Sequence, residues 1–74
     1  MAIKKVNVHG FTVEYEENLK AGIEYLKYDL DFNEAKIFFE AARRHGKADF
    51  EDDADRNWRL IYNGSRGIYT LVRR

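Results

Sequence analysis

The stretch from Asp31 to Phe50, DFNEAKIFFEAARRHGKADF, decides the fold, because it predicts a helix that ends at a glycine and continues into a strand. Asp31 and Glu34 have the spacing of a capping box, in which two side chains satisfy the first free backbone N–H groups of a helix. Gly46 follows a basic last turn and stands where helices commonly stop in the left-handed conformation. The sequence therefore predicts a helix at about residues 32–45 and a strand after it.

The apolar residues of this helix recur at the spacing of one helical face. They are Ala35, Phe38, Phe39 and Ala42, and we expect Ile37 and Ala41 to widen the face on one side. An arc of this width predicts two neighbours, a sheet below the helix and a second helix beside it.

A preceding helix is predicted at about residues 18–30, with Asn18 as its N-cap. Gly22 lies at the edge of its narrow apolar stripe. There it either permits a close approach to the second helix or simply lowers helix propensity. No Gly or Pro separates the two helices, so one long helix over residues 18–44 is an open alternative.

Residues 3–16 predict a β-hairpin. The apolar residues alternate in one phase up to position 8 and in the opposite phase from position 11, and a two-residue turn at His9-Gly10 explains the change. This register places Val8 opposite Phe11 on an apolar face. It also gives the pairs Val6 with Val13, Asn7 with Thr12, and Lys5 with Glu14.

Residues 47–73 predict a meander of three strands. A three-residue loop over Asp53–Asp55, with Asp55 left-handed, forms the first turn, and Gly64-Ser65 forms the second. The first turn pairs Phe50 with Trp58, Ala48 with Leu60, Asp52 with Arg56, and Asp49 with Arg59. The second pairs Tyr62 with Gly67, Leu60 with Tyr69, Trp58 with Leu71, and Ile61 with Ile68. Both turns place the large apolar residues on one face, and this agreement supports the meander.

These elements predict a two-layer α+β fold of order ββααβββ. An antiparallel sheet, made of the N-terminal hairpin and the C-terminal three-stranded meander, carries two helices packed on one face. The 74 residues are enough for one domain, so a single domain over residues 1–74 is expected.

Composition restricts the function further. The chain has no cysteine, so neither disulfide bonds nor thiolate metal sites stabilise its small core, and self-association is an expected source of stability. With 13 basic and 13 acidic residues the formal net charge is zero, which argues against nucleic-acid binding driven by overall charge but not against a local basic patch. No apolar run approaches the roughly 20 residues of a membrane helix. The N-terminal stretch has no apolar core of the kind a signal peptide needs, so cytoplasmic residence without membrane contact is expected.

The residues form no catalytic, cofactor or metal motif. The acidic run at 49–55 fails as a calcium-binding EF-hand loop, because Trp58 stands where glycine is needed and Gly64 where a bidentate Glu is needed. The histidines, His9 and His45, have no Asp, Ser or Cys at a spacing typical of a triad or a zinc site. We therefore predict a protein that is not an enzyme, holds no cofactor or metal and has no evident small-molecule ligand.

The outer face of the last hairpin is the strongest candidate for a contact surface. The predicted register points four residues away from the helices: Ile61, Ile68, Thr70 and Val72. Contiguous exposed apolar area usually marks a contact surface, although single exposed isoleucines are ordinary and a helix that wraps further would cover them. The sequence thus predicts a small interaction domain that binds a protein partner or a second copy of itself through this face.

Two other functions are predicted as alternatives. One is a nucleic-acid-binding or regulatory protein with a basic patch at the end of the second helix and at the C-terminus, in which six residues contact phosphates: Arg43, Arg44, Lys47, Arg66, Arg73 and Arg74. The weaker alternative is an inhibitor whose acidic turn, residues 49–55, imitates phosphates and blocks a nucleic-acid-binding protein.

Overall fold

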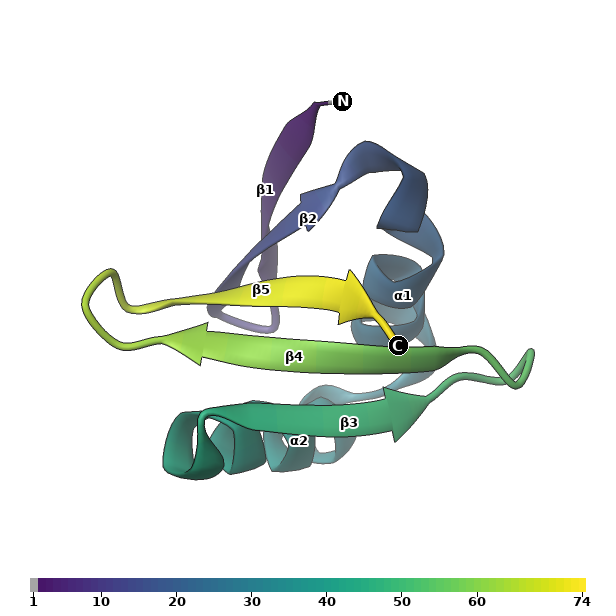
Figure 1. Cartoon of the computed structure of the whole chain (residues 1–74). Coiled ribbons are helices and arrows are strands. Elements are labelled where there is room, and N and C mark those ends of the chain that lie inside the picture. The colour runs from purple at the N-terminus through teal and green to yellow at the C-terminus, as the bar shows by residue number, and fades with distance from the viewer. Residues whose placement is uncertain (1) are drawn as a thin grey trace.

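The computed structural model describes residues 2–74 and has the predicted α+β order ββααβββ (Figure 1). Strands β1 and β2 are followed by a helical region of three short segments, by helix α2 and by strands β3 to β5. The bounds are β1 Ile3–Val8, β2 Phe11–Glu16, η1 Glu17–Leu19, α1 Lys20–Glu24, η2 Tyr25–Asp29, α2 Phe32–His45, β3 Lys47–Glu51, β4 Asn57–Asn63 and β5 Ile68–Arg73.

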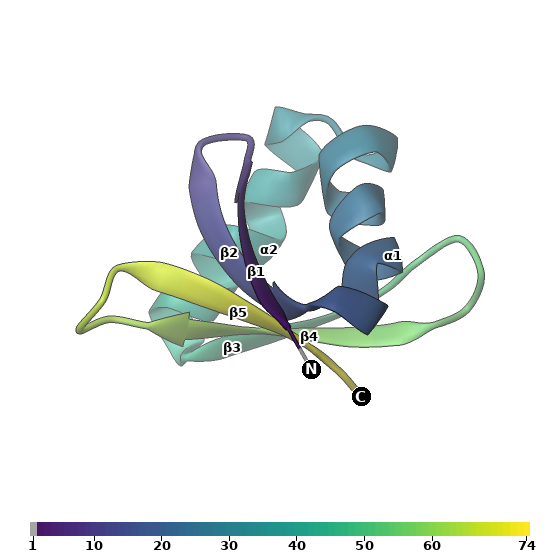
Figure 2. The same ribbon diagram turned by 90° about the horizontal axis from the view of Figure 1, so that it is seen from above.

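All five strands belong to one sheet, in the order β1-β2-β5-β4-β3. The prediction of a fully antiparallel sheet is wrong at one junction, because β2 pairs with β5 in parallel. Only three residue pairs join these strands: Val13 with Tyr69, Glu14 with Thr70, and Tyr15 with Leu71. The β1–β2 hairpin rises steeply from the meander toward the helices, so the sheet is strongly bent at this junction (Figure 2).

Helix α2 begins and ends at the residues that the sequence predicts. The Glu34 backbone N–H donates to the Asp31 carboxylate over 2.8 Å, and the Asp31 N–H donates to the Glu34 carboxylate over 3.0 Å. Gly46 follows the helix with a φ of 91°. Ile37 does not belong to the buried arc, because it is 67% exposed. Two residues on from Ala35 correspond to roughly 200° of rotation, which places Ile37 on the solvent side of the helix.

The first helical region is separate from α2, so the alternative of one long helix is wrong. Leu30 and Asp31 are both extended and end the region. The region begins as a 3₁₀ turn whose N-cap is Glu16 rather than Asn18, and its last segment, η2, is a π-helical turn. The His9 ring stabilises the end of this turn, since its Nε2 donates to the carbonyls of Leu26 and Leu30 at 3.0 and 3.1 Å.

Gly22 lets this helical region approach the sheet, and not the second helix. A Cβ atom at this position would lie 2.8 Å from Leu71 Cδ2 and 2.8 Å from Trp58 Cδ2, closer than side-chain atoms normally pack. Trp58 is 1% exposed, so its ring has little room to move. Glycine is therefore required here by the contact between the helical layer and the sheet.

The strand registers follow the predictions except at the last turn. The β1–β2 and β3–β4 registers are confirmed, and Asp55 takes the expected left-handed conformation with a φ of 62°. Between β4 and β5 the predicted register is wrong by two residues, since Ile61 lies opposite Thr70 and Tyr62 opposite Tyr69. The connecting turn spans residues 64–67, and Gly67 takes the positive φ of 67°. A shift of two residues keeps every side chain on its face, so the predicted inner face is still correct.

The core lies between the inner face of this bent sheet and the helical layer. Its largest fully buried side chains are Trp58, Phe39, Leu26, Leu60, Leu71, Val8 and Val13. Phe11 of the hairpin stacks on Phe39 with ring centroids 4.3 Å apart, which joins the raised hairpin to α2. The helices thus cover one face of the sheet and leave the other face without a helical layer (Figure 2).

Candidate functional site

The uncovered outer face of the sheet carries the predicted contact residues, but their exposure is uneven. Ile61 is 39% exposed, Thr70 and Val72 are half-buried, and Ile68 is only 8% exposed. Ile68 was predicted to be an exposed contact residue, but its side chain is largely buried. The Arg66 guanidinium forms two hydrogen bonds, of 3.0 and 3.1 Å, with the Glu14 carboxylate on the neighbouring strand. Because Glu14 lies opposite Thr70, this ion pair links the β4–β5 turn to β2.

A groove of about 450 Å³ lies where the hairpin diverges from the end of β5. Glu14 and Glu16 border it on the hairpin side, and Arg73 borders it on the other. Its remaining lining is mainly apolar: Ile3, Tyr15, Leu19, Thr70, Leu71 and Val72. Two of the predicted contact residues, Thr70 and Val72, thus share a hollow with residues of the first strand pair.

Ile3 and Leu19 also line the groove but were not among the predicted contact residues. Ile3 is 60% exposed and lies opposite Glu16 in the hairpin. The predicted Lys5–Glu14 pair already placed Lys5 on the polar outer face, and Ile3 has the same phase as Lys5 in the strand. That phase was the available signal for Ile3. Nothing local indicates Leu19, because its position depends on the parallel pairing of β2 with β5.

Opposite charges lie on the two sides of the groove. Glu16 and Glu17 stand at the end of β2 and form no ion pair with any residue between 2 and 74. Arg73 borders the other side. Outside the groove, Arg59 and Arg74 share one acid, since Asp49 is 2.7 Å from Arg59 Nε and 3.7 Å from Arg74. The hydrogen bond from Arg59 is the main reason that the pKa of the Asp49 carboxyl lies below its usual value. An unpaired acid, Glu16, therefore borders one side of the groove and a cation, Arg73, borders the other, although the exposed Lys5 and Glu51 on the same face also form no ion pair within residues 2–74.

The six basic residues predicted to form a nucleic-acid patch do not gather at one place. Arg66 is bound to Glu14, Arg74 approaches Asp49, and the Arg73 guanidinium lies 5.2 Å from the centre of the Trp58 ring. Arg66 and Arg73 stand at opposite ends of β5, roughly 20 Å apart at the usual rise of a strand. Three exposed residues without an ion pair to residues 2–74 remain at the end of α2 and the start of β3: Arg43, Arg44 and Lys47.

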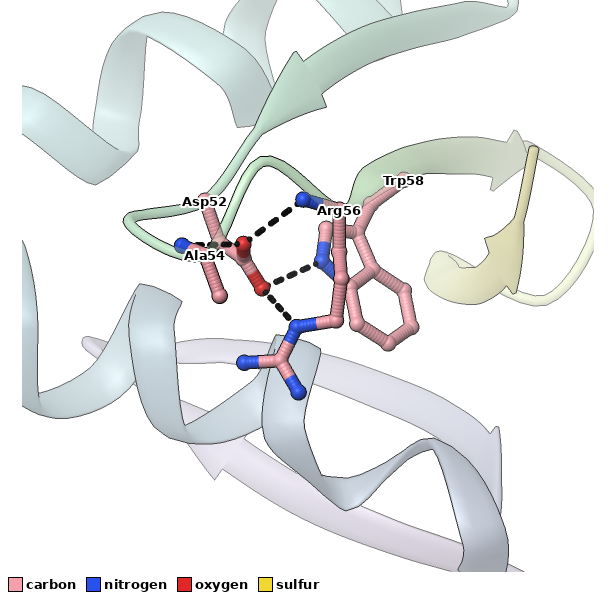
Figure 3. Close-up of polar contacts among 4 residues, drawn as sticks. All are labelled: Asp52, Ala54, Arg56 and Trp58. Carbon is pink, nitrogen blue, oxygen red and sulfur yellow. Dashed lines mark hydrogen bonds and ion pairs between the residues drawn. The ribbon is translucent and has the colours of Figure 1, made fainter.

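The acidic turn is built around one buried carboxylate (Figure 3). Asp52 is 6% exposed, and its Oδ1 accepts the backbone N–H groups of Ala54 and Arg56 at 2.9 and 3.0 Å. Its Oδ2 accepts the Trp58 indole N–H at 2.9 Å and the Arg56 Nε at 2.8 Å. The sequence predicted the Asp52–Arg56 pair but not the indole bond, which requires the buried ring to lie beneath the turn.

The environment of Asp52 changes its acidity. Burial alone raises the pKa of this carboxyl, but the hydrogen bonds from Trp58, Arg56 and Ala54 outweigh it and lower the pKa to about 2. The pKa of the neighbouring Asp53 shifts in the opposite direction, because burial and the nearby Asp29 carboxyl raise it. With Asp52 used inside the fold and Asp49 bound to Arg59, fewer carboxylates are available as phosphate mimics than the sequence suggests.

No group of three or more His, Cys, Asp or Glu within residues 2–74 is arranged to hold a metal ion. No helix in the same range is long and apolar enough to cross a membrane. Comparison of the chain with protein-family models, with curated proteins and with solved structures gives no match.

Proposed function

We propose that this chain is a small, non-enzymatic interaction domain that binds a protein through the outer face of its sheet. The observation that carries the proposal is the groove of about 450 Å³ between the hairpin and β5. Its apolar lining continues into the exposed Ile61 on β4, so apolar surface extends across several strands. We include cytoplasmic residence in the proposal.

The position of the groove supports this function. A β-sheet buries one face against its helices, and apolar residues on the other face remain in water unless a partner covers them. Here the second face has β-branched side chains in its middle and charged side chains at its margins. Apolar centres with polar margins are typical of protein contact surfaces.

Site-specific photo-cross-linking tests the proposal. A photoreactive amino acid replaces Ile3 beside the groove or, as a matched control, Ile37 on the solvent side of α2; the two isoleucines are 60% and 67% exposed. In the cells that produce the protein, we expect discrete protein adducts from position 3 and none from position 37. Equal labelling at both positions, or no adduct at position 3, would refute the proposal.

A second candidate function is nucleic-acid binding by Arg43, Arg44 and Lys47. The observation in its favour is that these exposed cations have no acidic partner among residues 2–74. Binding through three phosphate contacts predicts a salt slope of about −3 in a plot of log affinity against log salt. The measurement is fluorescence anisotropy with labelled single- and double-stranded DNA and RNA, and the variant Arg43→Glu/Arg44→Glu should abolish the signal. The absence of binding at low salt would exclude this function.

A further inference from the structure

The outer face is complementary to itself. Glu16 borders its groove on the hairpin side and forms no ion pair within residues 2–74, while Arg73 borders the groove on the other side, with Arg74 next to it in the chain. A two-fold axis through the groove would place the acidic side of one copy against the basic side of the other. Symmetric dimers require this property, because the same patch serves both subunits.

The shape of this surface is also compatible with two-fold pairing. Ile3 lines the groove and is 60% exposed, and the half-buried Val72 and Leu19 line the same groove. Each copy therefore has both an exposed apolar side chain and an apolar hollow on one face. Related by a two-fold axis, the Ile3 side chains of two copies would each enter the hollow of the other.

Size and net charge are compatible with this pairing. A stable interface buries about 800 Å² on each partner, which is about one sixth of the 4621 Å² surface of this chain. The formal net charge is zero, so two copies approach without overall repulsion.

We infer that the protein occupying this groove is a second copy of the same chain, in a two-fold dimer that pairs Glu16 of each copy with Arg74 of the other. The inference rests on the proposed function, because it names the partner of that same surface. It predicts a dimer held by exchanged Ile3 side chains at the centre and by two charge pairs at the margins.

Sedimentation velocity of the purified chain, from about 10 μM to 1 mM, measures the association. We expect a monomer–dimer equilibrium in this range. Ile3→Arg should weaken the dimer at least about tenfold, because it puts a charge into the apolar centre. Its matched control, Ile37→Arg, should leave the equilibrium unchanged. A chain that stays monomeric at every concentration, or a dimer that Ile3→Arg leaves intact, would overturn the inference.

Charge exchange tests the two-fold pairing itself. Glu16→Arg and Arg74→Glu should each weaken self-association, because each homodimer then contains two like-charged pairs. An equimolar mixture of the two variants should regain it, since both pairs in the mixed dimer are again of opposite charge. If the mixture fails to associate, the pairing is wrong.

The two proposals fail in different ways. A monomeric chain that still gives adducts with another protein from position 3 overturns the second copy and leaves the contact surface in place. The absence of any adduct at position 3 removes both. Circular dichroism spectra of each variant confirm that the fold is retained, since the exchanged residues are on the surface.

Discussion

The two turns of the meander each connect neighbouring antiparallel strands of the same sheet, but they are stabilised differently. The β3–β4 turn encloses the buried carboxylate of Asp52, which accepts four hydrogen bonds. The β4–β5 turn, residues 64–67, is exposed, and its main side-chain contact is the surface pair between Arg66 and Glu14. One turn is specified by buried polar contacts, and the other by glycine and backbone hydrogen bonds.

The difference shows which local signals determine a register. Asp52 has to meet its donors in the buried turn, so a shift of β3 against β4 would leave a charge and an indole N–H unpaired. In the β4–β5 turn Gly64 and Gly67 allow either a two-residue or a four-residue connection, and both keep the apolar side chains on the inner face. The sequence prediction was correct for the first turn and wrong by two residues for the second.

The largest expected effect is the loss of the Asp52 carboxylate. Asp52→Asn keeps the side-chain size but presents an NH₂ group to either the backbone donors or the Trp58 and Arg56 donors. Because buried donors would be left unsatisfied, we expect a loss of about 3 kcal/mol in the free energy of unfolding. Urea denaturation followed by the fluorescence of Trp58, the only tryptophan, measures this loss beside the site.

Asp55→Asn is the matched control for this change. It lies in the same turn, is exposed and has a φ of 62°, which Asn tolerates as well as Asp. Its unfolding free energy should stay within about 0.5 kcal/mol of the original protein. If both variants lose the same stability, the buried carboxylate does not determine this turn.

Lowering the pH should reduce the stability that the buried Asp52 carboxylate gives to this turn. The pKa of Asp52 is about 2 in the folded protein against 3.8 for a free side chain, so the folded state binds this proton less tightly than the unfolded state. The stabilisation is therefore complete well above pH 3.8 and is lost as the pH falls toward 2. From the two pKa values we expect about 2 kcal/mol of extra acid sensitivity relative to Asp52→Asn. Parallel stability profiles of the two proteins between pH 5 and about pH 2 would contradict this assignment.

A smaller effect is expected where the helical layer contacts the Trp58 ring. Gly22→Ala places a methyl group 2.8 Å from ring atoms and should cost about 1–2 kcal/mol after the gain in helix propensity is subtracted. The control is Gly64→Ala in the β4–β5 turn, where the added methyl group would lie 3.4 Å from the nearest atom, an ordinary packing distance. Thermal unfolding monitored by circular dichroism compares the two variants, and an equal midpoint shift would contradict the proposed close contact.

The smallest effect belongs to the exposed turn. The Arg66 side chain is 51% exposed, so breaking its pair with Glu14 by Arg66→Ala should cost less than about 1 kcal/mol. A double-mutant cycle with Glu14→Gln isolates the pair energy from the other effects of removing the Arg66 side chain. A coupling above about 2 kcal/mol would mean that this ion pair, rather than the glycines, determines the β4–β5 register.

Local rules predicted the parts of the fold that depend on a few neighbouring residues. Asp31, Glu34 and Gly46 determine the ends of α2, and the His9-Gly10 turn determines the hairpin register. The parallel pairing of β2 with β5 has no local signal, because it joins residues more than fifty positions apart. The π-helical turn at Tyr25–Asp29 likewise depends on His9, which reaches the end of that turn from a distant hairpin.

The candidate site was likewise predicted only where it depends on the alternation of side chains along a strand. Alternation along β4 and β5 correctly placed Ile61, Thr70 and Val72 on the outer face. The burial of Ile68 was missed, and the sequence also did not place β2 beside β5. The groove itself forms only where the hairpin and the meander diverge, so no single element could have indicated it.

The place of β5 at the centre of the sheet has a consequence for folding during synthesis. This strand follows every other element in the chain, yet it lies between β2 and β4. The hairpin and the β3–β4 pair are synthesised before the strand that joins them, and their apolar inner faces meet only when β5 inserts. We therefore expect the slow step of folding to be this late closure over a long stretch of chain. A nascent chain halted before Ile68 should remain open to proteases and to chaperones.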